Sequence, residues 1–511
     1  MQNNRFYITT AIPYVNAQPH IGFALELVQA DALARYHRML GEDVRLVNGS
    51  DENALKNVQA AEKAGVSVQA FVDEHAQRFQ GLSDVRVLNI SNDDFIRTTE
   101  ERHVRGAQKL WAACKKEDIY KKTYDGLYCV GCEEFKTPKE LIDGLCPEHR
   151  VAPERVAEEN YFFRLSHYQN ALLELIESGA LTITPSTRKN EVLSFIREGL
   201  EDFSISRSVA RAKGWGIDVP GDSSQKMYVW FDALTNYITA LGYADNAELF
   251  QRYWLENDQR VHLVGKGITR FHAIYWPAML LSAGLPVPST ILVHGYVTVD
   301  GEKISKSLGN GIDPYAAVEQ YRTDVVRYFL LREIPSGEDG DFSFEKLKAR
   351  YAGDLANGLG NLVQRTAVLA QTKIGDSFMW DLAGERRSEH WHFVHADENY
   401  HAAFQEFRLH DAVADVWKKI ATVNQYINEE KPWALEAGER QRDILLHMIG
   451  MVAHIAWLLQ PLMPETAQNI FALFGIESTK ELIPGTELRI EKGEGLFPRL
   501  QRAMLNRPRC R

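Results

Sequence analysis

Residues 5–51 decide the fold, and they read RFYITTAIPYVNAQPHIGFALELVQADALARYHRMLGEDVRLVNGSD. Aromatic and β-branched residues predict a strand at 5–12, and a turn rich in Pro, Asn and Gly follows it. The apolar spacing then predicts a helix over 21–40 and a second strand at 44–47, which ends in the turn 48–51. Strand, helix and strand at this spacing form a βαβ unit, so the sequence predicts a parallel sheet with a right-handed crossover.

The same pattern returns in the middle of the chain. Strands are predicted at 261–265 and 291–299, and a helix at 271–282 lies between them. The intervening region 115–226 has a different composition, because it is rich in charged and aromatic residues and contains three of the five cysteines. We therefore predict an insertion between two halves of one nucleotide-binding sheet.

The last part of the chain has helical periodicity. After residue 356 the strand signals fade, and 395–428 and 438–463 carry apolar residues at spacings of three and four, typical of a helical bundle. The expected fold is α/β. Its predicted parts are a nucleotide-binding domain split into 1–114 and 227–291, an inserted domain at 115–226, a linking domain at 292–355 and a helical domain at 356–511.

Composition narrows the class of protein. With 45% hydrophobic and 25% charged residues the chain is expected to be globular, and its net charge of −11 gives no sign of non-specific binding to nucleic acid. Five cysteines in 511 residues do not resemble a disulfide scaffold. No apolar run reaches the roughly 18 residues of a membrane span, since the longest candidate, 448–463, is interrupted by His454 and Gln460. A strand pattern begins almost at the first residue, so we expect a cytoplasmic protein without a leader or a membrane partner.

Four residues have the spacing of a metal site. Cys129 and Cys132 form one pair, and Cys146 and His149 form a second pair thirteen residues later. Each pair can place two donors on one tight turn, and three thiolates with one imidazole suit tetrahedral Zn²⁺ without leaving an open catalytic position. The pattern predicts one structural zinc ion. The alternative is a chance cluster of buried cysteines.

A candidate phosphate site stands where the first strand meets the first helix, at Pro19-His20-Ile21-Gly22. Helix N-termini carry unpaired N–H groups that suit phosphate. Gly22 would allow close approach of a nucleotide to the backbone, and His20 could donate to the α-phosphate. Taken alone, a histidine at a helix start is more often structural.

A second polar motif favours the phosphate-binding role of His20 over a structural one. Lys303-Ile304-Ser305-Lys306-Ser307 lies between Gly301 and Gly309. Lys303, Ser305 and Lys306 could fold over a triphosphate and neutralise the departing pyrophosphate. The alternative is an ordinary solvated loop.

Together these motifs resemble the HIGH and KMSKS signatures of the class I aminoacyl-tRNA synthetases, which lie one in each half of a split Rossmann-type fold. Their surroundings resemble the methionine-specific branch of that family, through TAIPYVN at 10–16, YVWFDA at 228–233, FHAIYWPAML at 271–280 and HGY at 294–296. The Cys/His pattern also resembles the zinc knuckle in the inserted domain of many members. The resemblance extends from about residue 5 to residue 500. It implies activation of L-methionine with ATP, accompanied by Mg²⁺, and transfer of the methionyl group to tRNA(Met).

The resemblance also implies roles for individual residues. Asp51, with the backbone at Ala11 and Ile12, would hold the substrate ammonium group. The thioether would lie among residues that without the resemblance would be read as core packing: Tyr14, Trp230, Ala233, Tyr237, Phe271 and His272. Asn361, Arg365 and Trp433 match anticodon-reading positions, because amide and guanidinium groups can bond base edges and an indole can stack on a base.

The sequence departs from the usual signatures in several places. Phe23 replaces the second histidine of the first signature, so one donor to phosphate is missing. Asn53 lies in Asp-Glu-Asn-Ala where Asp-Glu-His-Gly is usual, Gly267 replaces a common acidic residue, and Leu234 replaces a common proline. We expect an active enzyme with a reduced rate.

Two other readings remain open at this point. One is a class I synthetase for another amino acid, although 511 residues leave little room for the large editing insertion of the isoleucine, valine and leucine enzymes. The other is a catalytically impaired paralogue that binds tRNA or methionine. The expected oligomeric state is a monomer.

Overall fold

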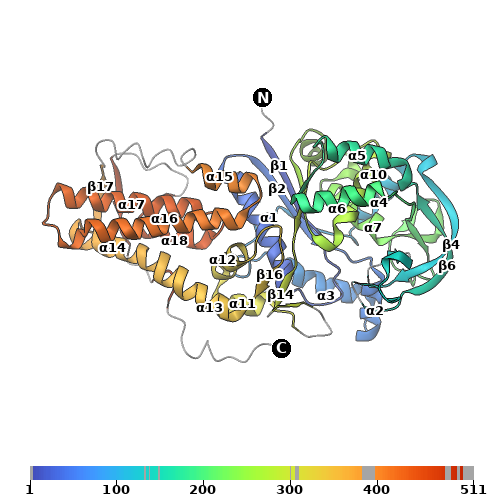
Figure 1. Cartoon of the computed structure of the whole chain (residues 1–511), viewed down its shortest axis with the longest axis horizontal. Helices are drawn as coiled ribbons and strands as arrows, with labels where there is room; N and C mark the ends of the chain where they lie inside the picture. The colour runs from blue at the N-terminus through green and yellow to red at the C-terminus, as the bar shows by residue number, and fades with distance from the viewer. Residues whose placement is uncertain are drawn as a thin grey trace. The chain divides into compact units, whose positions relative to one another are not determined.

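The structure is a computed structural model that describes residues 4–131, 134–136, 138–147, 150–299, 301–304, 310–381, 397–477, 485–491 and 495–498. Internal contacts divide the chain into two compact units (Figure 1). Unit 1 contains Met1–Pro19, Glu42–Ser83 and Ser91–His294, and unit 2 contains His20–Gly41, Asp84–Ile90 and Gly295–Arg511.

Unit 1 is built on a parallel sheet of six strands in the order β3-β2-β1-β12-β13-β7. The strands are β1 (Arg5–Thr10), β2 (Asp43–Ser50), β3 (Asp94–Arg97), β7 (Thr182–Thr184), β12 (Arg260–Gly265) and β13 (Thr290–His294). Phe6, Tyr7 and Ile8 are at most 2% exposed, as expected for a parallel strand covered on both faces. The predicted α/β fold with a parallel central sheet is confirmed.

The strand order reverses between β1 and β12. From β1 the chain continues to β2 and β3 on one side, whereas β12 leads to β13 on the other. In open α/β sheets a crevice forms at such a reversal, beyond the carboxyl ends of the strands, and ligands bind there. Ala11 follows β1 and Lys266 follows β12, so the sheet itself points to these turns as the place of a site.

The helices of unit 1 include α2 (Leu55–Ala64), α3 (Val68–Gly81), α4 (Glu101–Ala113), α7 (Val229–Leu234), α8 (Asn236–Thr239) and α10 (Trp276–Ser282). The helix predicted at 271–282 has two parts, since a π-helical turn, η7 (Phe271–Tyr275), precedes α10. Pro277 has no N–H to donate to the carbonyl of Ala273, which accounts for a change of helical type at this point.

The region predicted as an insertion is mostly antiparallel. Its larger sheet has the order β5-β4-β6-β8, with β4 (Ile119–Cys129), β5 (Glu134–Lys136), β6 (Glu154–Phe163) and β8 (Phe203–Ser204). A smaller sheet contains β9 (Ser206–Ser208), β10 (Asp218–Val219) and β11 (Asp222–Met227), and two helices, α5 (Gln169–Glu177) and α6 (Ser186–Arg197), lie between β6 and β8 in the chain. Residues of β7, inside the range 115–226, pair with β13 and form one edge of the central sheet.

Unit 2 begins with α1 (Ile21–Met39), which follows β1 in the chain. A small sheet joins β14 (Val297–Val299), β15 (Glu302–Lys303) and β16 (Gly340–Phe342). The single strand predicted at 291–299 is therefore two strands in different sheets. Gly295 stands at the break, where a Cβ atom would lie 2.1 Å from the carbonyl oxygen of Glu338 and could not be accommodated.

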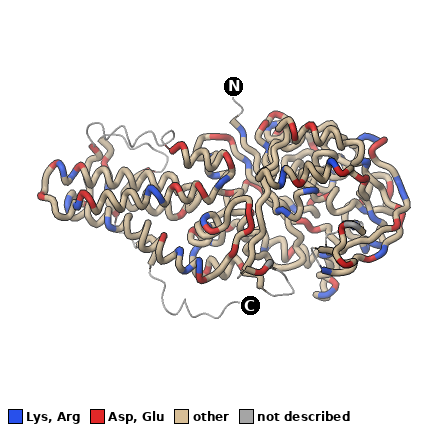
Figure 2. The backbone as a smooth tube through the Cα atoms, viewed as in Figure 1, with Lys and Arg blue, Asp and Glu red and all other residues tan. Residues whose placement is uncertain are grey.

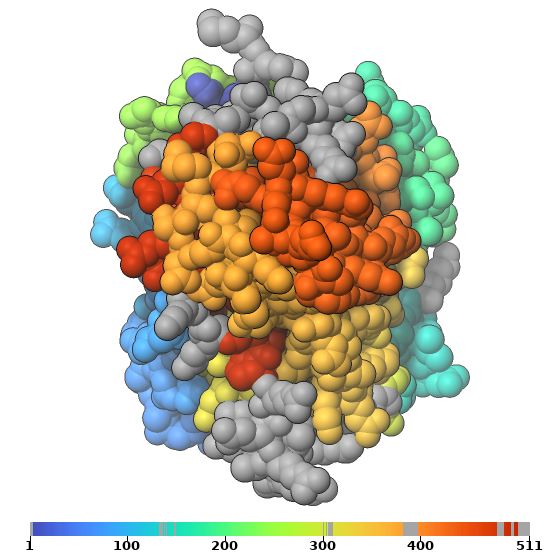
Figure 3. All heavy atoms as spheres, turned by 90° about the vertical axis from the view of Figure 1, so that its left-hand side faces the viewer, coloured from blue at the N-terminus to red at the C-terminus, as the bar shows by residue number. Residues whose placement is uncertain are grey.

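The remaining described elements of unit 2 are helical apart from one strand pair. They include α11 (Pro314–Tyr321), α12 (Thr323–Glu333), α13 (Phe344–Arg350), the π-helical η8 (Tyr351–Gly360), α14 (Asn361–Lys373), α15 (Glu398–Gln405), α16 (Leu409–Glu430), η10 (Pro432–Ala434), α17 (Glu439–Leu459) and α18 (Pro464–Leu473). Segments coloured orange, among them α14 and α16, form much of the surface that faces the viewer in Figure 3. β17 (Ser377–Trp380) pairs with β18 (Thr486–Arg489), a pairing that the sequence analysis missed.

Two features hold the helices of unit 2 together. α17 is long and apolar enough to cross a membrane, but 72% of its apolar window is buried inside the protein, which identifies a core helix. Arg327 on α12 is fully buried and lies 2.7 Å from Asp31 on α1. Its guanidinium also donates to the carbonyls of Leu88, Pro461 and Leu462 at 2.9–3.1 Å. A buried charge of this kind is tolerated only with such complete pairing.

Candidate active site

The turn after β1 and the end of β2 are joined by backbone pairing. Tyr14 and Asp51 form a parallel bridge, and the Asp51 N–H donates to the carbonyl of Pro13 at 2.8 Å. The N–H of Ala11 donates to the carbonyl of Leu263 in β12 at 3.2 Å. These bonds place the predicted residues Ala11, Tyr14 and Asp51 on segments that meet at the reversal of strand order.

Asp51 carries a buried carboxylate, and it is only 2% exposed. The Asn53 N–H donates to its Oδ1 at 3.3 Å, and the Asn57 side chain donates to its backbone carbonyl at 3.0 Å. The neighbouring Glu52 carboxylate accepts from Arg97 at 2.7 and 2.9 Å. The buried Asp51 carboxylate, directly after the end of β2, suits a substrate ammonium group.

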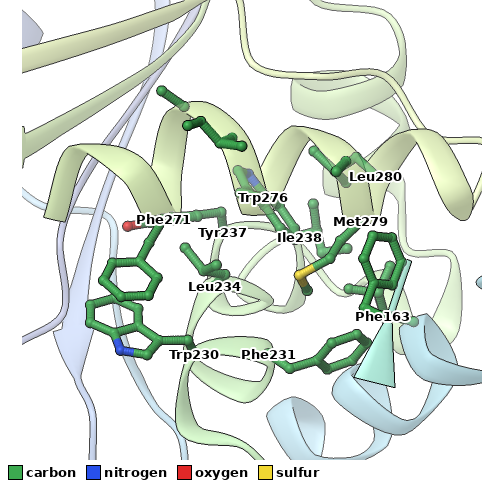
Figure 4. Packing of buried hydrophobic residues seen from close by; sticks show 14 of the residues in the cluster. Phe163, Trp230, Phe231, Leu234, Tyr237, Ile238, Phe271, Trp276, Met279 and Leu280 are labelled. Carbon is green, nitrogen blue, oxygen red and sulfur yellow. The ribbon is translucent and has the colours of Figure 1, made fainter. Parts of the chain in front are cut away.

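Two aromatic rings from distant segments stack in unit 1. The rings of Trp230 on α7 and Phe271 on η7 lie 3.7 Å apart with an interplanar angle of 5° (Figure 4). Tyr14 and His272 each meet Trp230 edge-on, both at 6.4 Å. The indole N–H of Trp230 is buried and has no hydrogen-bond partner among the described residues. The structure thus gathers four of the residues predicted to line the thioether site.

Tyr237 and His272 form a neutral polar pair within this aromatic cluster. His272 Nδ1 lies 2.9 Å from the carbonyl of Ile268, which can only accept, so Nδ1 carries the proton. Nε2 is then the acceptor for the Tyr237 hydroxyl at 2.7 Å. Burial lowers the pKa of His272 to about 4, so the imidazole is uncharged at neutral pH.

A second buried histidine supports this pair and was missed in the sequence. His262 on β12 stacks on Tyr237 with ring centres 4.0 Å apart, and it bonds Thr9 at 2.7 Å and Trp276 at 3.2 Å. Burial holds the pKa of His262 well below its ordinary value. A lone histidine between apolar residues of a strand was the only signal that could have indicated it.

Lys56 is a further residue that the motifs did not indicate. Its ammonium group lies 4.6 Å from the centre of the Tyr14 ring. Lys56 stands in the first turn of α2, a few residues after Asp51. Its positive charge therefore lies beside Tyr14, one of the residues predicted to line the amino-acid site.

The first nucleotide motif forms the start of α1 in unit 2. His20 is the N-cap of α1, and its Nδ1 accepts from the Gly22 N–H at 3.1 Å. The proton of a neutral His20 therefore lies on Nε2, which makes that atom a hydrogen-bond donor. A Cβ atom on Gly22 would lie 2.9 Å from the His20 ring, and Phe23 stacks on that ring at 4.3 Å.

The first nucleotide motif and the segment that follows the second one, far apart in the sequence, meet in unit 2. The Ile21 N–H donates to the carbonyl of Ile312 at 2.9 Å, and a Cβ atom on Gly311 would lie 3.9 Å from both His20 and Ile304. Lys303 ends β15, and nothing is described of its side chain. The predicted residues Ser305 and Lys306 lie outside the described part of the chain.

The hairpin that precedes the second motif is anchored by Asp341. This carboxylate accepts from the Gly301 N–H at 2.7 Å and from the Thr298 hydroxyl at 2.8 Å. Burial alone would raise the pKa of Asp341, but these donors and the nearby Lys346 hold it below the ordinary value. The base of the loop is therefore held even though its tip is not described.

Two of the predicted zinc ligands are described. Cys129 ends β4, and both Cys129 and Cys146 are fully buried. The backbone of Cys146 makes two hydrogen bonds: its carbonyl accepts from the Arg150 N–H at 2.7 Å, and its N–H donates to the carbonyl of Val151 at 2.9 Å. Cys132 and His149 lie outside the described residues. Within the described ranges no group of three or more possible ligands is found.

The predicted anticodon residues lie on two elements of unit 2. Asn361 begins α14 and Arg365 follows one turn later. The Arg365 guanidinium lies 4.4 Å from the ring centre of Trp433 and donates to Asn428 at 3.2 Å. Trp433 is 41% exposed, so much of an indole remains available to solvent beside a guanidinium.

Comparison with known proteins gives consistent matches. Residues 6–157 and 150–367 match the family described as tRNA synthetases class I (M). The chain is 42% identical to a methionine–tRNA ligase of Thermotoga maritima, over 97% of this chain and 80% of the relative. It is 41% identical to that of Brucella suis biovar 1, over 94% and 93%.

Solved structures are also similar. Mycobacterium tuberculosis methionyl-tRNA synthetase in complex with methionyl-adenylate matches with a TM-score of 0.89 and 39% identity, over 97% of this chain and 100% of that one. The free form of the same enzyme matches with a TM-score of 0.82 and 36% identity, over 97% and 98%.

Proposed function

The chain belongs to the methionine–tRNA ligases of the class I tRNA synthetase family, and from that premise we propose how its residues carry out the reaction. A methionine carboxylate oxygen attacks the α-phosphorus of ATP, the bond to the bridging oxygen breaks and pyrophosphate leaves. A terminal ribose hydroxyl of tRNA then attacks the methionyl carbonyl, and AMP leaves. The substrate supplies its own nucleophile, so the protein orients groups and stabilises charge.

Methionine binds, in this proposal, where the strand order reverses. Asp51 pairs with the ammonium group, helped by backbone groups at Ala11 and Ile12. The thioether lies against the stacked rings of Trp230 and Phe271, because sulfur–aromatic contacts favour a long polarizable side chain. Tyr14, Ala233, Tyr237 and His272 complete the set. The observation that carries the proposal is that the buried Asp51 is paired through its backbone with Tyr14, whose ring meets Trp230 edge-on.

The neutral pair of Tyr237 and His272 suits this ligand. A charged imidazole would favour an anionic or strongly polar side chain, whereas a neutral one costs little beside a thioether. The low pKa of His272, caused by its burial, therefore supports methionine over a polar amino acid.

ATP is proposed to bind at the two signature motifs. His20 Nε2 donates to the phosphate on which charge develops, Gly22 allows the nucleotide close to the start of α1, and Lys303, Ser305 and Lys306 neutralise the pyrophosphate. The bond between Ile21 and Ile312 supports this, because it joins the start of α1 to the segment that follows the second motif. Mg²⁺ would accompany ATP through phosphate oxygens and water and would neutralise phosphate charge.

A structural zinc ion is proposed at Cys129, Cys132, Cys146 and His149. The buried thiols of Cys129 and Cys146 and the tight turn after Cys146 fit such a group. When bound, zinc would stabilise a lobe too small for a core of its own. Elemental analysis of the purified chain is expected to give one zinc per chain, and Cys129→Ser should lower both the zinc content and the melting temperature. Full folding of zinc-free protein would contradict the assignment.

Anticodon reading is proposed for Asn361, Arg365 and Trp433. The Arg365–Trp433 contact supports it, since a base can stack on the exposed indole while the guanidinium bonds its edge. Lys and Arg are interspersed with Asp and Glu along the chain (Figure 2), so recognition of tRNA(Met) would depend on particular side chains.

The described cysteines form no disulfide with one another, which supports a cytoplasmic location. The monomeric state stays a prediction to be tested by light scattering.

The experiment that tests the proposed function is ATP–pyrophosphate exchange with each amino acid in turn. Exchange with methionine alone is expected. Exchange with another amino acid would overturn the assignment of the thioether site, and no exchange from folded, zinc-loaded protein would favour the impaired paralogue.

A further inference from the structure

Asn53 connects the two parts of the proposed methionine site. It lies two residues after Asp51, and its backbone N–H donates to the Asp51 carboxylate at 3.3 Å. Its side chain points the other way, to Asp232 at 2.7 Å and to the carbonyl of Thr98 at 3.1 Å. Both acceptors can only accept, so the amide nitrogen must face them and both of its N–H bonds are used.

Asp232 is the residue through which this connection reaches the aromatic cluster. It lies on α7 between Trp230 and Ala233, and it is fully buried. Its Oδ1 accepts from His103 Nε2 at 2.7 Å, and its Oδ2 accepts from Asn53. A buried carboxylate without donors is strongly disfavoured, so these two bonds fix the position of α7 relative to Asn53 and His103.

The other side of this network is rigid. His103 Nδ1 bonds the Thr239 hydroxyl at 2.8 Å, and α4 approaches α8 so closely that a Cβ atom on Gly106 would lie 2.3 Å from Thr239. This close packing against α8 limits how far α4 can shift to replace a lost bond. Asn53 is the one donor to Asp232, among the described contacts, that comes from the segment of Asp51.

We propose that Asn53 is a positioning residue for methionine binding, which keeps Asp51 and the α7 residues Trp230 and Ala233 in register. This rests on the proposed methionine site. Loss of the amide would leave Asp232 Oδ2 without its donor, and α7 would shift to bring it toward water or another N–H group. The ammonium and thioether parts of the site would then no longer match one substrate.

The test compares substitutions that remove the donor with one that keeps it. Asn53→Ala removes it, whereas Asn53→His keeps an N–H and leaves the backbone bond to Asp51 unchanged. In pyrophosphate exchange, Asn53→Ala is expected to raise KM for methionine about tenfold, the consequence of one unsatisfied buried group. KM for ATP should change by less than about twofold, and Asn53→His should stay within about threefold of wild type for methionine.

Asn257→Ala is the matched control, because Asn257 is a fully buried asparagine of unit 1 whose amide donates to the carbonyls of Tyr253 and Gln259. It should lower the melting temperature without changing KM for methionine. If Asn53→Ala does not fold, Asn53→Asp takes its place in the comparison with Asn53→His. Asn53→Asp removes the donor and places a second carboxylate beside Asp232. Equal effects of Asn53→Ala and Asn257→Ala on KM for methionine would overturn the proposal. Failure of the wild type to exchange with methionine would instead overturn the proposed function.

Discussion

The Phe23→His substitution separates two effects at the start of α1. Phe23 cannot donate to phosphate, but its ring stacks on His20 at 4.3 Å with an interplanar angle of 27°. This contact holds the imidazole whose Nδ1 accepts from Gly22. Phe23 therefore lacks one function of the usual histidine and retains another.

The magnitudes of the two effects differ. A donor to developing charge contributes about 3 kcal/mol in comparable sites, so Phe23→His is expected to raise kcat by as much as about 100-fold. An aromatic pair contributes about 1 kcal/mol beyond its burial, so Phe23→Leu, which has neither a ring nor a donor, should lower kcat about fivefold. Asn53 does not supply the missing donor, because its amide is bound to Asp232 and Thr98.

The assay is pyrophosphate exchange at saturating methionine and ATP, with melting temperatures measured in parallel. Opposite changes in kcat for the two variants, with melting temperatures close to wild type, are expected. An unchanged or lower kcat for Phe23→His would refute the view that a donor is missing. An unchanged kcat for Phe23→Leu would refute the role of the stack.

Three further predictions concern other groups. Gly22→Ala places a methyl group 2.9 Å from the His20 ring and should lower kcat about tenfold with little change in melting temperature; a kcat equal to that of the wild type would contradict the close packing. Burial lowers the folded-state pKa of His272 from 6.5 to about 4, so its contribution to stability is present above pH 6.5 and declines as the pH falls toward 4. Urea unfolding should show about 2 kcal/mol of stability lost between pH 7 and pH 5, less in His272→Gln, and an equal loss in both proteins would argue against this source. Burial would raise the pKa of Asp397, but His454 at 2.5 Å and Lys419 lower it to about 2. This stability is present above pH 3.8 and lost as the pH falls through about 2, so Asp397→Asn should cost about 2 kcal/mol at pH 7, and no cost in urea unfolding would contradict the pairing.

The parts of the fold that the sequence predicted are those with local signals. The βαβ unit of residues 5–51 was predicted because strand and helix periodicity lie within one continuous stretch. β7 and the β17–β18 pair were missed, since each is a short strand whose partner is distant in the sequence. The break of 291–299 into two strands was missed because it depends on contact of Gly295 with Glu338.

In the site, too, residues within local motifs were predicted, whereas residues that act through distant contacts were not. The first motif indicated His20, whereas Asp51 and Trp230 were indicated only by the resemblance to the family, which the comparisons confirm. Asn53 stood out in the sequence only as a departure from a signature, because its bond to Asp232 spans 179 residues. His262 carried no motif at all, and only the packing of Tyr237 against it shows its part in the site.

The most direct test of the central claim is a crystal structure of the chain with a non-hydrolysable methionyl-adenylate analogue. The account predicts the ammonium group within hydrogen-bond distance of Asp51 and the thioether sulfur in contact with Trp230 or Phe271. A ligand bound with its ammonium group away from Asp51, or with its thioether outside the aromatic cluster, would contradict the account.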